Sequence, residues 1–562
     1  MCGLAHGLDK PLLMLAEEDY SAPFDYQDLL VNCPTARECV IQAESFLEQT
    51  LAQYRDRRQV QRPDRLAAVQ LATELKGLRL GEYIAENEAD QLQNYFVETS
   101  AYKLALQGRS GIFVGRKGTG KTANLIHLAS ALQADKRNLV VVIQPVGYDL
   151  AGLTRLLKKY RERDTKGYVV DSLWKFLIYS ELAHAAALDI EQRPGGGPYT
   201  SAEDELLKMF RLPGSPLRDD FSVRLERALE SLNPLPEDEG IEETRLAISE
   251  ALHGSVLGQL RRLLGDLLFR RERVAVLVDN LDKAWSRDGD LEYLSELMLG
   301  LFSVAGTIPN EFSRPDRSRK PVNLTLTVFL RSDIFSYVIG NARERDKISF
   351  SRILWNDRET LLRILDERLV ASQGTTVGPD ELWQRFFMPN VASVPVREYL
   401  VSRIQPRPRD ILYLTATAIE IAINRGHSRI EESDILEAEK QYSQYALDTI
   451  ETEATATLSD PKSVLYEFIG ANEILEHNEL EGLMPKAGVP SEQFQNTIDY
   501  LTGCGFLGLE IRYGEFNFAA DENDLEKNTV LGRKLLESEG RQPRYKINVP
   551  FQSFLEVQRK MR

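Results

Sequence analysis

The residues with the clearest chemical potential form one short run that ends in a lysine and a threonine. The run comprises Gly115, Arg116, Lys117, Gly118, Thr119, Gly120, Lys121 and Thr122. It matches the phosphate-loop pattern GxxxxGK[ST], with the apolar stretch GIFVG before it and the helix-like stretch TANLIHLASALQA after it. Glycines let backbone N–H groups turn toward a phosphate, and the helix N-terminus adds a partial positive charge. We therefore predict a nucleotide-binding loop, with Lys121 on the β- and γ-phosphates and Thr122 on Mg²⁺.

A second stretch, VAVLVDNLDKAW at residues 274–285, predicts the metal partner of that loop. Its apolar residues are typical of a buried strand, and Asp279 follows them directly. In a parallel sheet this carboxylate would lie beside the phosphate loop, where it can hold Mg²⁺ directly or through water. We predict Thr122 and Asp279 as the metal-binding pair.

The residue after this aspartate raises the question of turnover. Asn280 carries no charge and cannot act as a general base, so Asp282 is the next acid available. Asp282 could orient a water at the γ-phosphate, and the alternative is that it caps the following helix. The sequence leaves both interpretations open.

Three arginine-containing segments could sense or stabilise phosphate charge. Arg331 ends the strand-like stretch VFLR, and an ion pair with Asp333 or Asp279 is the alternative role for it. Arg409 lies in RPRD at a helix start and could fold back on the nucleotide, or form a surface salt bridge instead. Arg343 and Arg345 could reach a neighbouring subunit, although such charged loops are usually only solvated.

The apolar patterns predict the elements that must position these residues. Strands over 111–115, 138–148, 274–279 and 323–331 alternate with helical stretches, which is typical of a parallel sheet covered on both faces. A helical insertion is expected at about 150–270, interrupted by loops at 192–201 and 233–240. The predicted fold class is therefore α/β, a P-loop NTPase with a mostly parallel sheet and a long helical insertion.

Two further domains are expected after this core. Helical patterns over 356–455 predict a lid, and residues 456–562 read as three short helices followed by two strands, the order of a winged helix. Its recognition helix would be 491–503, which contains Glu492 and Asp499 but no Lys or Arg. Direct reading of DNA by that helix is not expected.

The first 60 residues form a separate segment, which puts the ATPase core at 61–355. The stretch GLAHGLDKPLLMLA predicts a helix end, a glycine turn and a buried strand, and a long helix follows after residue 35. This segment resembles the closing half of a Rossmann-like domain of the TIR-like or nucleoside 2-deoxyribosyltransferase kind. That resemblance implies that any glycosidase-type residues would lie upstream of Met1. A simple α/β adaptor segment is the alternative.

Together, GRKGTGKT, VLVDNLDKAW, VFLRSDIF and QPRPRD resemble a family of P-loop ATPases. The resemblance is to the STAND, KAP and origin-recognition-like branch related to AAA+ proteins, and it covers about residues 90–560. It implies Mg²⁺ on Asp279, Arg331 as a sensor and Arg409 as a second sensor. KAP-type relatives have two successive acids after the strand, so Asn280 places hydrolysis, rather than binding, in question.

The overall composition narrows the function further. The net charge of −16 argues against sequence-independent nucleic-acid binding, and no apolar run is long enough to span a bilayer. The N-terminus has no signal-peptide pattern and the four cysteines form no CxxC pair, so we expect a cytoplasmic protein with reduced thiols.

With no guanine-reading NKxD element, ATP is the expected nucleotide. We expect an ATP-driven switch that assembles with itself or with protein partners through its lid and winged helix, in bacterial signalling or anti-phage defence. A non-hydrolysing scaffold and a DNA-associated motor or loader are the alternatives.

Overall fold

The computed structural model divides the chain into two compact units. One is Met1–Gly77 with Ile423–Arg429, and the other is Leu78–Ala422 with Ile430–Arg562. The residues that the structure describes are 13–16, 30–48, 50, 74–145, 152, 154–155, 157–158, 163–193, 198–232, 258–283, 285, 290–314, 320–374, 377–454, 458–518, 530, 532, 534, 536, 538 and 540–558.

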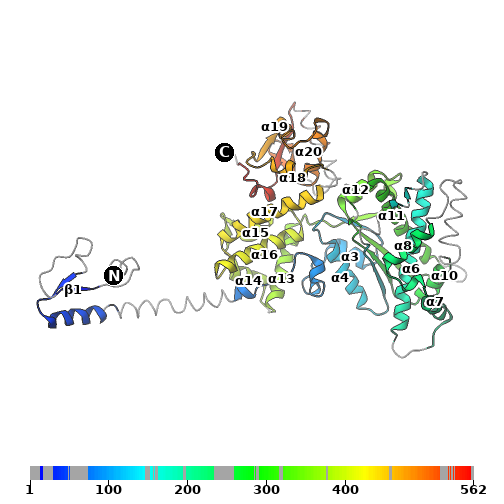
Figure 1. Cartoon of the computed structure of the whole chain (residues 1–562), viewed down its shortest axis with the longest axis horizontal. Coiled ribbons are helices and arrows are strands. Elements are labelled where there is room, and N and C mark those ends of the chain that lie inside the picture. The colour runs from blue at the N-terminus through cyan, green and yellow to red at the C-terminus, as the bar shows by residue number, and fades with distance from the viewer. Residues whose placement is uncertain are drawn as a thin grey trace. The chain divides into compact units, whose positions relative to one another are not determined.

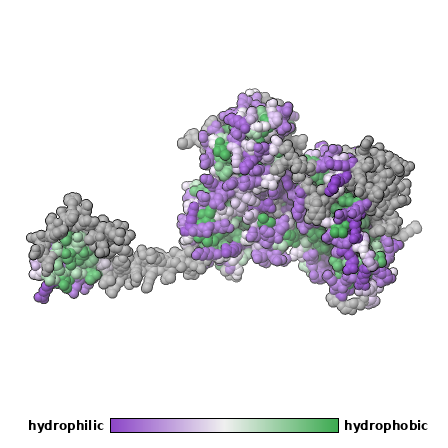
Figure 2. Space-filling model, viewed as in Figure 1, coloured by the Kyte–Doolittle hydropathy of each residue, from purple (hydrophilic) through white to green (hydrophobic). Residues whose placement is uncertain are grey.

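In the first unit, two short parallel strands precede a helix. β1 (Met14–Ala16) pairs with β2 (Leu30–Asn32), and a helix follows over 36–48. The prediction that this first strand is buried is wrong, because its residues are half-buried or exposed. Several apolar side chains are exposed in this unit, as Figure 2 shows, and they include Leu15, Val40, Ile41 and Leu47. The helix end and turn predicted before residue 13 lie outside the described residues.

The second unit contains a five-stranded, all-parallel sheet in the order β4-β5-β6-β3-β7. The strands are β3 (Gly111–Gly115), β4 (Leu139–Ile143), β5 (Val274–Val278), β6 (Leu324–Arg331) and β7 (Phe350–Arg352). The first four were expected from their apolar runs. The edge strand β7 was not, because its three residues carry no such run. Since all strands are parallel, their carboxyl ends meet at one edge.

Helices cover both faces of this sheet, as Figure 1 shows. Val274, Val276 and Val278 of β5 share one core with α6 (Arg163–Glu191) and α11 (Leu291–Ser313). The alternate residues Ala275 and Leu277 join a second core with α3 (Ser100–Leu106) and α4 (Lys121–Gln133). This alternation explains why β5 is apolar at every position. The predicted α/β P-loop fold is confirmed.

The helical insertion lies between β4 and β5 in the chain. It contains α6, α7 (Ser201–Arg211), α8 (Phe221–Leu232), α10 (Gly258–Leu268) and the short η4 (Pro216–Arg218). The Trp174 indole of α6 donates to the Leu297 carbonyl of α11 at 3.0 Å, which joins the insertion to the core. The loop predicted at 233–240 lies outside the described residues.

Within the part of the chain that the structure describes, one helix is long and apolar enough to cross a membrane. This helix is α11, and most of its apolar window is buried inside the protein. Its buried residues pack in the same core as α6 and the sheet. The apolar character of α11 is therefore that of a core helix.

The lid follows the sheet and is helical, as predicted. Its helices are α13 (Arg358–Gln373), α14 (Pro379–Phe386), α15 (Val396–Ser402), α16 (Pro408–Arg425) and α17 (Glu432–Ala454). Two other elements, α12 (Ser332–Gly340) and η6 (Arg345–Lys347), come before β7 and are not part of the lid. A small hairpin of β8 (Asn390–Val391) and β9 (Val394–Pro395) was missed. Its turn residues Ala392 and Ser393 have φ of 48° and 65°. Such turns usually carry Asn or Gly, and neither residue is present here, so this hairpin could not be predicted from its turn residues.

The C-terminal domain, which we define as residues 458–558, contains a four-stranded antiparallel sheet in the order β10-β13-β11-β12. Helix α18 (Pro461–Tyr466) precedes β10 (Ile474–Glu476), and α19 (His477–Leu483) and α20 (Phe494–Gly503) follow that strand. The chain continues through β11 (Leu507–Arg512), β12 (Glu515–Asn517), β13 (Arg544–Ile547) and α22 (Val549–Gln552). The predicted helices and the first hairpin are present, whereas β10 and β13 were missed.

Candidate nucleotide site

The phosphate loop joins β3 to α4 at the carboxyl edge of the sheet. Gly118 and Gly120 have φ of 85° and 83°, a left-handed backbone that glycine adopts without strain. The Asn124 amide donates to the Gly120 carbonyl at 2.7 Å, and the Thr119 hydroxyl donates to the Arg116 carbonyl at 2.8 Å. These bonds hold the loop in a closed turn, and the sequence motif is therefore matched by the backbone that it requires.

Lys121 lies folded back onto this loop. Its Nζ donates to the carbonyl oxygens of Gly115 at 3.1 Å and of Arg116 at 3.0 Å. Burial lowers the pKa of Lys121 to about 8, and the nearby Asp282 and Asp279 only partly offset this effect. A half-buried ammonium group whose charge nearby acids only partly offset is suited to binding a phosphate group.

Thr122 and Asp279 lie together, as a shared metal site requires. The Thr122 hydroxyl donates to the Asp279 carboxylate at 3.0 Å, although the two residues are far apart in the chain. Asp279 is 4% exposed, and this burial raises the pKa of its carboxyl group. A hydroxyl and a carboxylate are ligands that Mg²⁺ accepts beside substrate phosphates. The residues present therefore fit this metal.

Asn280 adopts a backbone that few residues tolerate. Its φ of 64° lies in the left-handed region, where Asn is enriched among non-glycine residues. Its backbone N–H bonds to the Asp279 carboxylate and lowers the pKa of that group, opposing the larger effect of burial. The missing acid at this position therefore coincides with a backbone that a glutamate would adopt poorly.

Asp282 lies in the turn at 281–283, close to the loop. Its carboxylate is 3.7 Å from the Arg331 guanidinium, and its side chain is about one-third exposed. Helix α11 begins at Leu291 with Asp290 as its N-cap, so Asp282 does not cap that helix. The interpretation of Asp282 as a helix cap is wrong.

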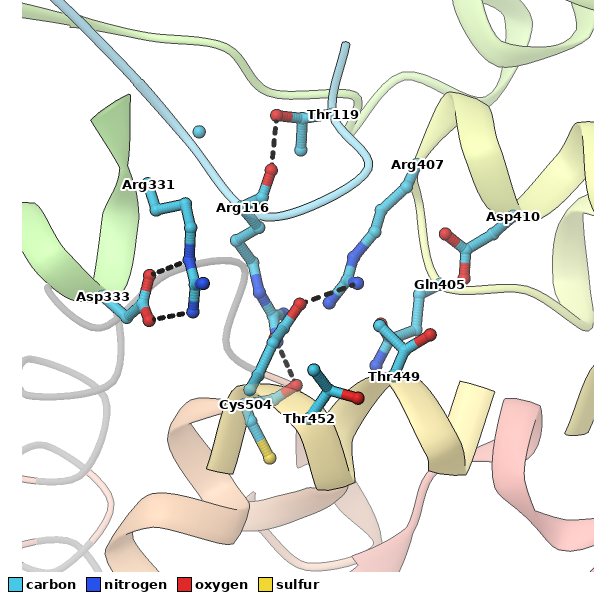
Figure 3. A network of polar contacts seen from close by, with 12 residues as sticks. Arg116, Thr119, Arg331, Asp333, Gln405, Arg407, Asp410, Thr449, Thr452 and Cys504 are labelled. Atoms are coloured by element: carbon cyan, nitrogen blue, oxygen red, sulfur yellow. Dashed lines mark hydrogen bonds and ion pairs between the residues drawn. The ribbon is translucent and has the colours of Figure 1, made fainter. Parts of the chain in front are cut away.

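Arg331 ends β6 beside the strand that carries the loop. It makes two bonds to Asp333, from Nε at 3.1 Å and from Nη2 at 2.5 Å, as Figure 3 shows. Burial opposes the charge of Arg331, but Asp333 and Asp282 raise its pKa above the usual value. The structure thus brings Arg331 to the site. Its main partner there is Asp333, one of the two acids predicted as an ion-pair partner.

Arg409 reaches the loop from the lid. Its backbone N–H lies 3.4 Å from the Gly118 carbonyl, and a Cβ at Gly118 would be 3.3 Å from the Arg409 Cβ. The glycine therefore permits the start of α16 to approach the loop closely.

Arg343 and Arg345 lie in the segment that leads into the amino end of β7, and both are exposed. The phosphate loop lies at the other edge of the sheet, where the strands have their carboxyl ends.

A second set of residues under the loop was missed from the sequence. The Arg116 guanidinium donates to the Cys504 carbonyl, as Figure 3 shows. Arg407 lies 3.8 Å from Glu453. Burial lowers the pKa of Arg116, and the like charge of Arg407 lowers it further. Arg407 stands two residues before Arg409 in RPRD, but this motif alone does not show which arginine is buried.

Comparisons with known proteins give a matching family model and a curated relative. Residues 359–451 match a family model described as the FunZ-associated C-terminal helical domain. A curated 80.3 kDa protein of Escherichia coli (strain K12), whose name refers to the transposon gamma-delta, is 24% identical over 377 residues. The match covers 66% of this chain and 51% of that protein, so the chain spans about half the length of this relative.

Some solved structures align with most of the chain at low similarity. The Aeropyrum pernix ORC2 protein in its ADPNP–ADP complexes is 14% identical, with a TM-score of 0.37, covering 81% of this chain and 95% of that chain. The Thermotoga maritima RuvB Holliday junction branch migration motor is 11% identical, with a TM-score of 0.30, covering 80% and 99%. At this similarity the fold assignment rests on the strand order and the phosphate loop.

Proposed function

We propose that this chain binds ATP with Mg²⁺ at the phosphate loop and hydrolyses it slowly as a conformational switch. The observation that carries this proposal is the 3.0 Å bond between Thr122 and Asp279 beside the half-buried Lys121. These residues come from α4 and from the end of β5, and they meet only because the sheet is parallel. The N–H groups of the loop and Lys121 would hold the phosphates.

The remaining residues divide into a metal pair and charge-sensing groups. Thr122 and Asp279 would hold Mg²⁺, which supplies positive charge that offsets the phosphate oxygens. Asp282 would accept a hydrogen bond from the attacking water and orient it. Arg331, 3.7 Å from Asp282, would stabilise negative charge there, and Arg409 would report phosphate occupancy to the lid.

Two contacts support the switch part of the proposal. Arg409 packs against Gly118 and links the loop to the lid, while Arg116 bonds to Cys504 and links it to the C-terminal domain. A conformational change in the loop would therefore alter its contacts with both domains. We further propose assembly with itself or with protein partners through those domains.

We place the protein in the STAND, KAP and origin-recognition-like branch of P-loop ATPases, in the bacterial cytoplasm. A role in signalling or anti-phage defence would follow from the TIR-like resemblance of its first segment. The domain boundaries near 60, 355 and 455 and the winged-helix assignment belong to this proposal. Helix α20 contains no Lys or Arg, so we do not propose that this helix reads DNA.

Steady-state phosphate release by purified full-length variants tests the proposal. We expect slow phosphate release by the wild type and no release by Lys121→Ala. The Asp282→Asn substitution should lower the rate of release at least about a hundredfold, as is usual for a water-orienting group. Asp346→Asn, which removes an exposed acid before β7, is the matched control and should keep the wild-type rate. ATP binding without release by any of them would favour the non-hydrolysing scaffold.

A further inference from the structure

A separate cavity borders the phosphate loop in the second unit. Its volume is about 630 Å³, within the range of small-molecule sites. Gly115, Arg116 and Thr119 contribute to its wall, whereas Lys121, Thr122 and Asp279 do not. The other walls are the segment after β7, the lid segment before α16, the start of α12 and parts of the C-terminal domain. The cavity is thus distinct from the ATP site but shares the loop with it.

Among the described residues, the charged side chains that line this cavity are all cationic. Four arginines line it, and no Asp or Glu is among the described residues of the lining. These arginines are Arg116, Arg352, Arg358 and Arg407. In a chain with a net charge of −16, an acid-free wall of this kind favours an anionic occupant.

Two buried donors in the lining lack partners. Arg407 is 3% exposed and its Nη2 has no hydrogen-bond partner; Gln405 is 4% exposed and its Nε2 has none either. Glu453 lies 3.8 Å from Arg407, and its negative charge also acts on Arg116. Figure 3 shows Arg116, Arg407 and Gln405 converging below the loop. Buried donors of this kind are normally satisfied by a ligand or by water.

The rest of the wall suits a planar group. Trp355, Phe335 and Phe518 contribute aromatic surface, and Trp355 is held in place by a 3.0 Å bond from its indole N–H to the Thr119 carbonyl. Three amide side chains, Asn356, Asn517 and Asn548, also line the cavity. Aromatic and amide groups together are suited to the face and the edge of a nucleobase.

We propose that this cavity binds a second nucleotide-class small molecule. Its phosphate would lie near Arg407 and Gln405, and its base would lie against the aromatic wall. Binding at this site does not require ATP turnover, because Lys121, Thr122 and Asp279 are not part of its lining. Since Trp355 bonds to Thr119 and Ile353 lies next to Gly115, occupancy would alter the phosphate loop. The two ligands should therefore change each other's affinity.

Calorimetric titration of the full chain carrying Lys121→Ala tests this site separately from the ATP site. The probes are the four common nucleoside monophosphates, with inorganic pyrophosphate as the anion that lacks a base. We expect one-to-one binding of at least one monophosphate, about tenfold or more tighter than pyrophosphate. Adding Arg352→Ala and Arg358→Ala should weaken that binding by about tenfold or more.

The matched control is Arg363→Ala, because Arg363 is an exposed cation of α13 outside the cavity. It should leave the affinity unchanged. Unchanged circular dichroism in the double variant would show that it still folds, and Arg407→Lys provides an independent variant, expected to weaken binding. Absence of monophosphate binding, equal affinity for pyrophosphate, or no effect of the arginine substitutions would overturn the proposal. Loss of ATP hydrolysis alone would bear only on the first site.

Discussion

Asn280 follows the candidate metal ligand Asp279 with a φ of 64°. A side chain in this region costs about 1–2 kcal/mol for most residues, and less for Asn or Gly. We expect Asn280→Gly to keep the unfolding midpoint of the wild type, whereas Asn280→Glu lowers the free energy of unfolding by about 1 kcal/mol. Urea denaturation of both variants measures this. Equal stability of the glutamate variant would contradict the backbone explanation.

Lys121 should make ATP binding depend on pH. Burial lowers its pKa to about 8 in the free protein, and a bound phosphate would raise it again. The protonated form of Lys121 binds ATP, so the affinity for ATP is highest below pH 8. It falls as the pH rises above 8, by at most about tenfold per pH unit. Titrations with ATP between pH 7 and 9.5 measure this slope. The Lys121→Ala variant should bind ATP weakly, with an affinity that does not change over this pH range. If its affinity for ATP fell with pH as in the wild type, Lys121 would be excluded as the cause of the pH dependence.

At the scale of elements, a buried ion pair fixes the lid to the segment before the sheet. Arg368 of α13 bonds to Glu88 of η2 (Ala85–Glu88), and their side chains are 5% and 4% exposed. Arg368 also packs on the Tyr95 ring. We expect Glu88→Gln to lower the free energy of unfolding by about 3 kcal/mol, because it leaves a buried charge without its partner.

Chemical denaturation checks this value, with Glu344→Gln as the matched control. Glu344 pairs with Lys347 at 2.6 Å on the surface, so its loss should cost less than about 0.5 kcal/mol. Similar losses in the two variants would show that the buried pair does not anchor α13.

At the scale of the whole second unit, Arg116 joins the loop to the turn after α20. We expect Arg116→Gln to release that turn and to speed amide hydrogen exchange over residues 501–506 by about tenfold, the effect of losing roughly one charged hydrogen bond. Exchange followed by mass spectrometry measures this. Lys117→Gln, in the same loop, is the control and should leave these amides unchanged.

The same measurement tests the switch. ATP should change exchange over residues 501–506 in the wild type but not in Lys121→Ala. An ATP response that persists in Lys121→Ala would show that the signal does not pass through the phosphate loop.

The sequence by itself determined the local chemistry and the principal strands. GRKGTGKT predicts its own turn because glycine alone adopts the φ values at Gly118 and Gly120 without strain. The runs that form β3, β5 and β6 are apolar because both faces of the sheet are covered. Short edge elements such as β7 and β8 left no pattern, because their pairing depends on neighbours distant in the chain.

Only the tertiary structure decided which residues meet. Thr122 and Asp279 come together across the sheet, and Asp282 lies away from the start of α11. Arg407, Gln405 and Arg352 converge on one cavity from the lid and from β7, which no local motif predicts. The physical reason is that the burial of a side chain, and the charges around it, depend on packing between residues distant in the chain. A sequence motif reflects only the backbone conformation and side chains of residues that are neighbours in the chain.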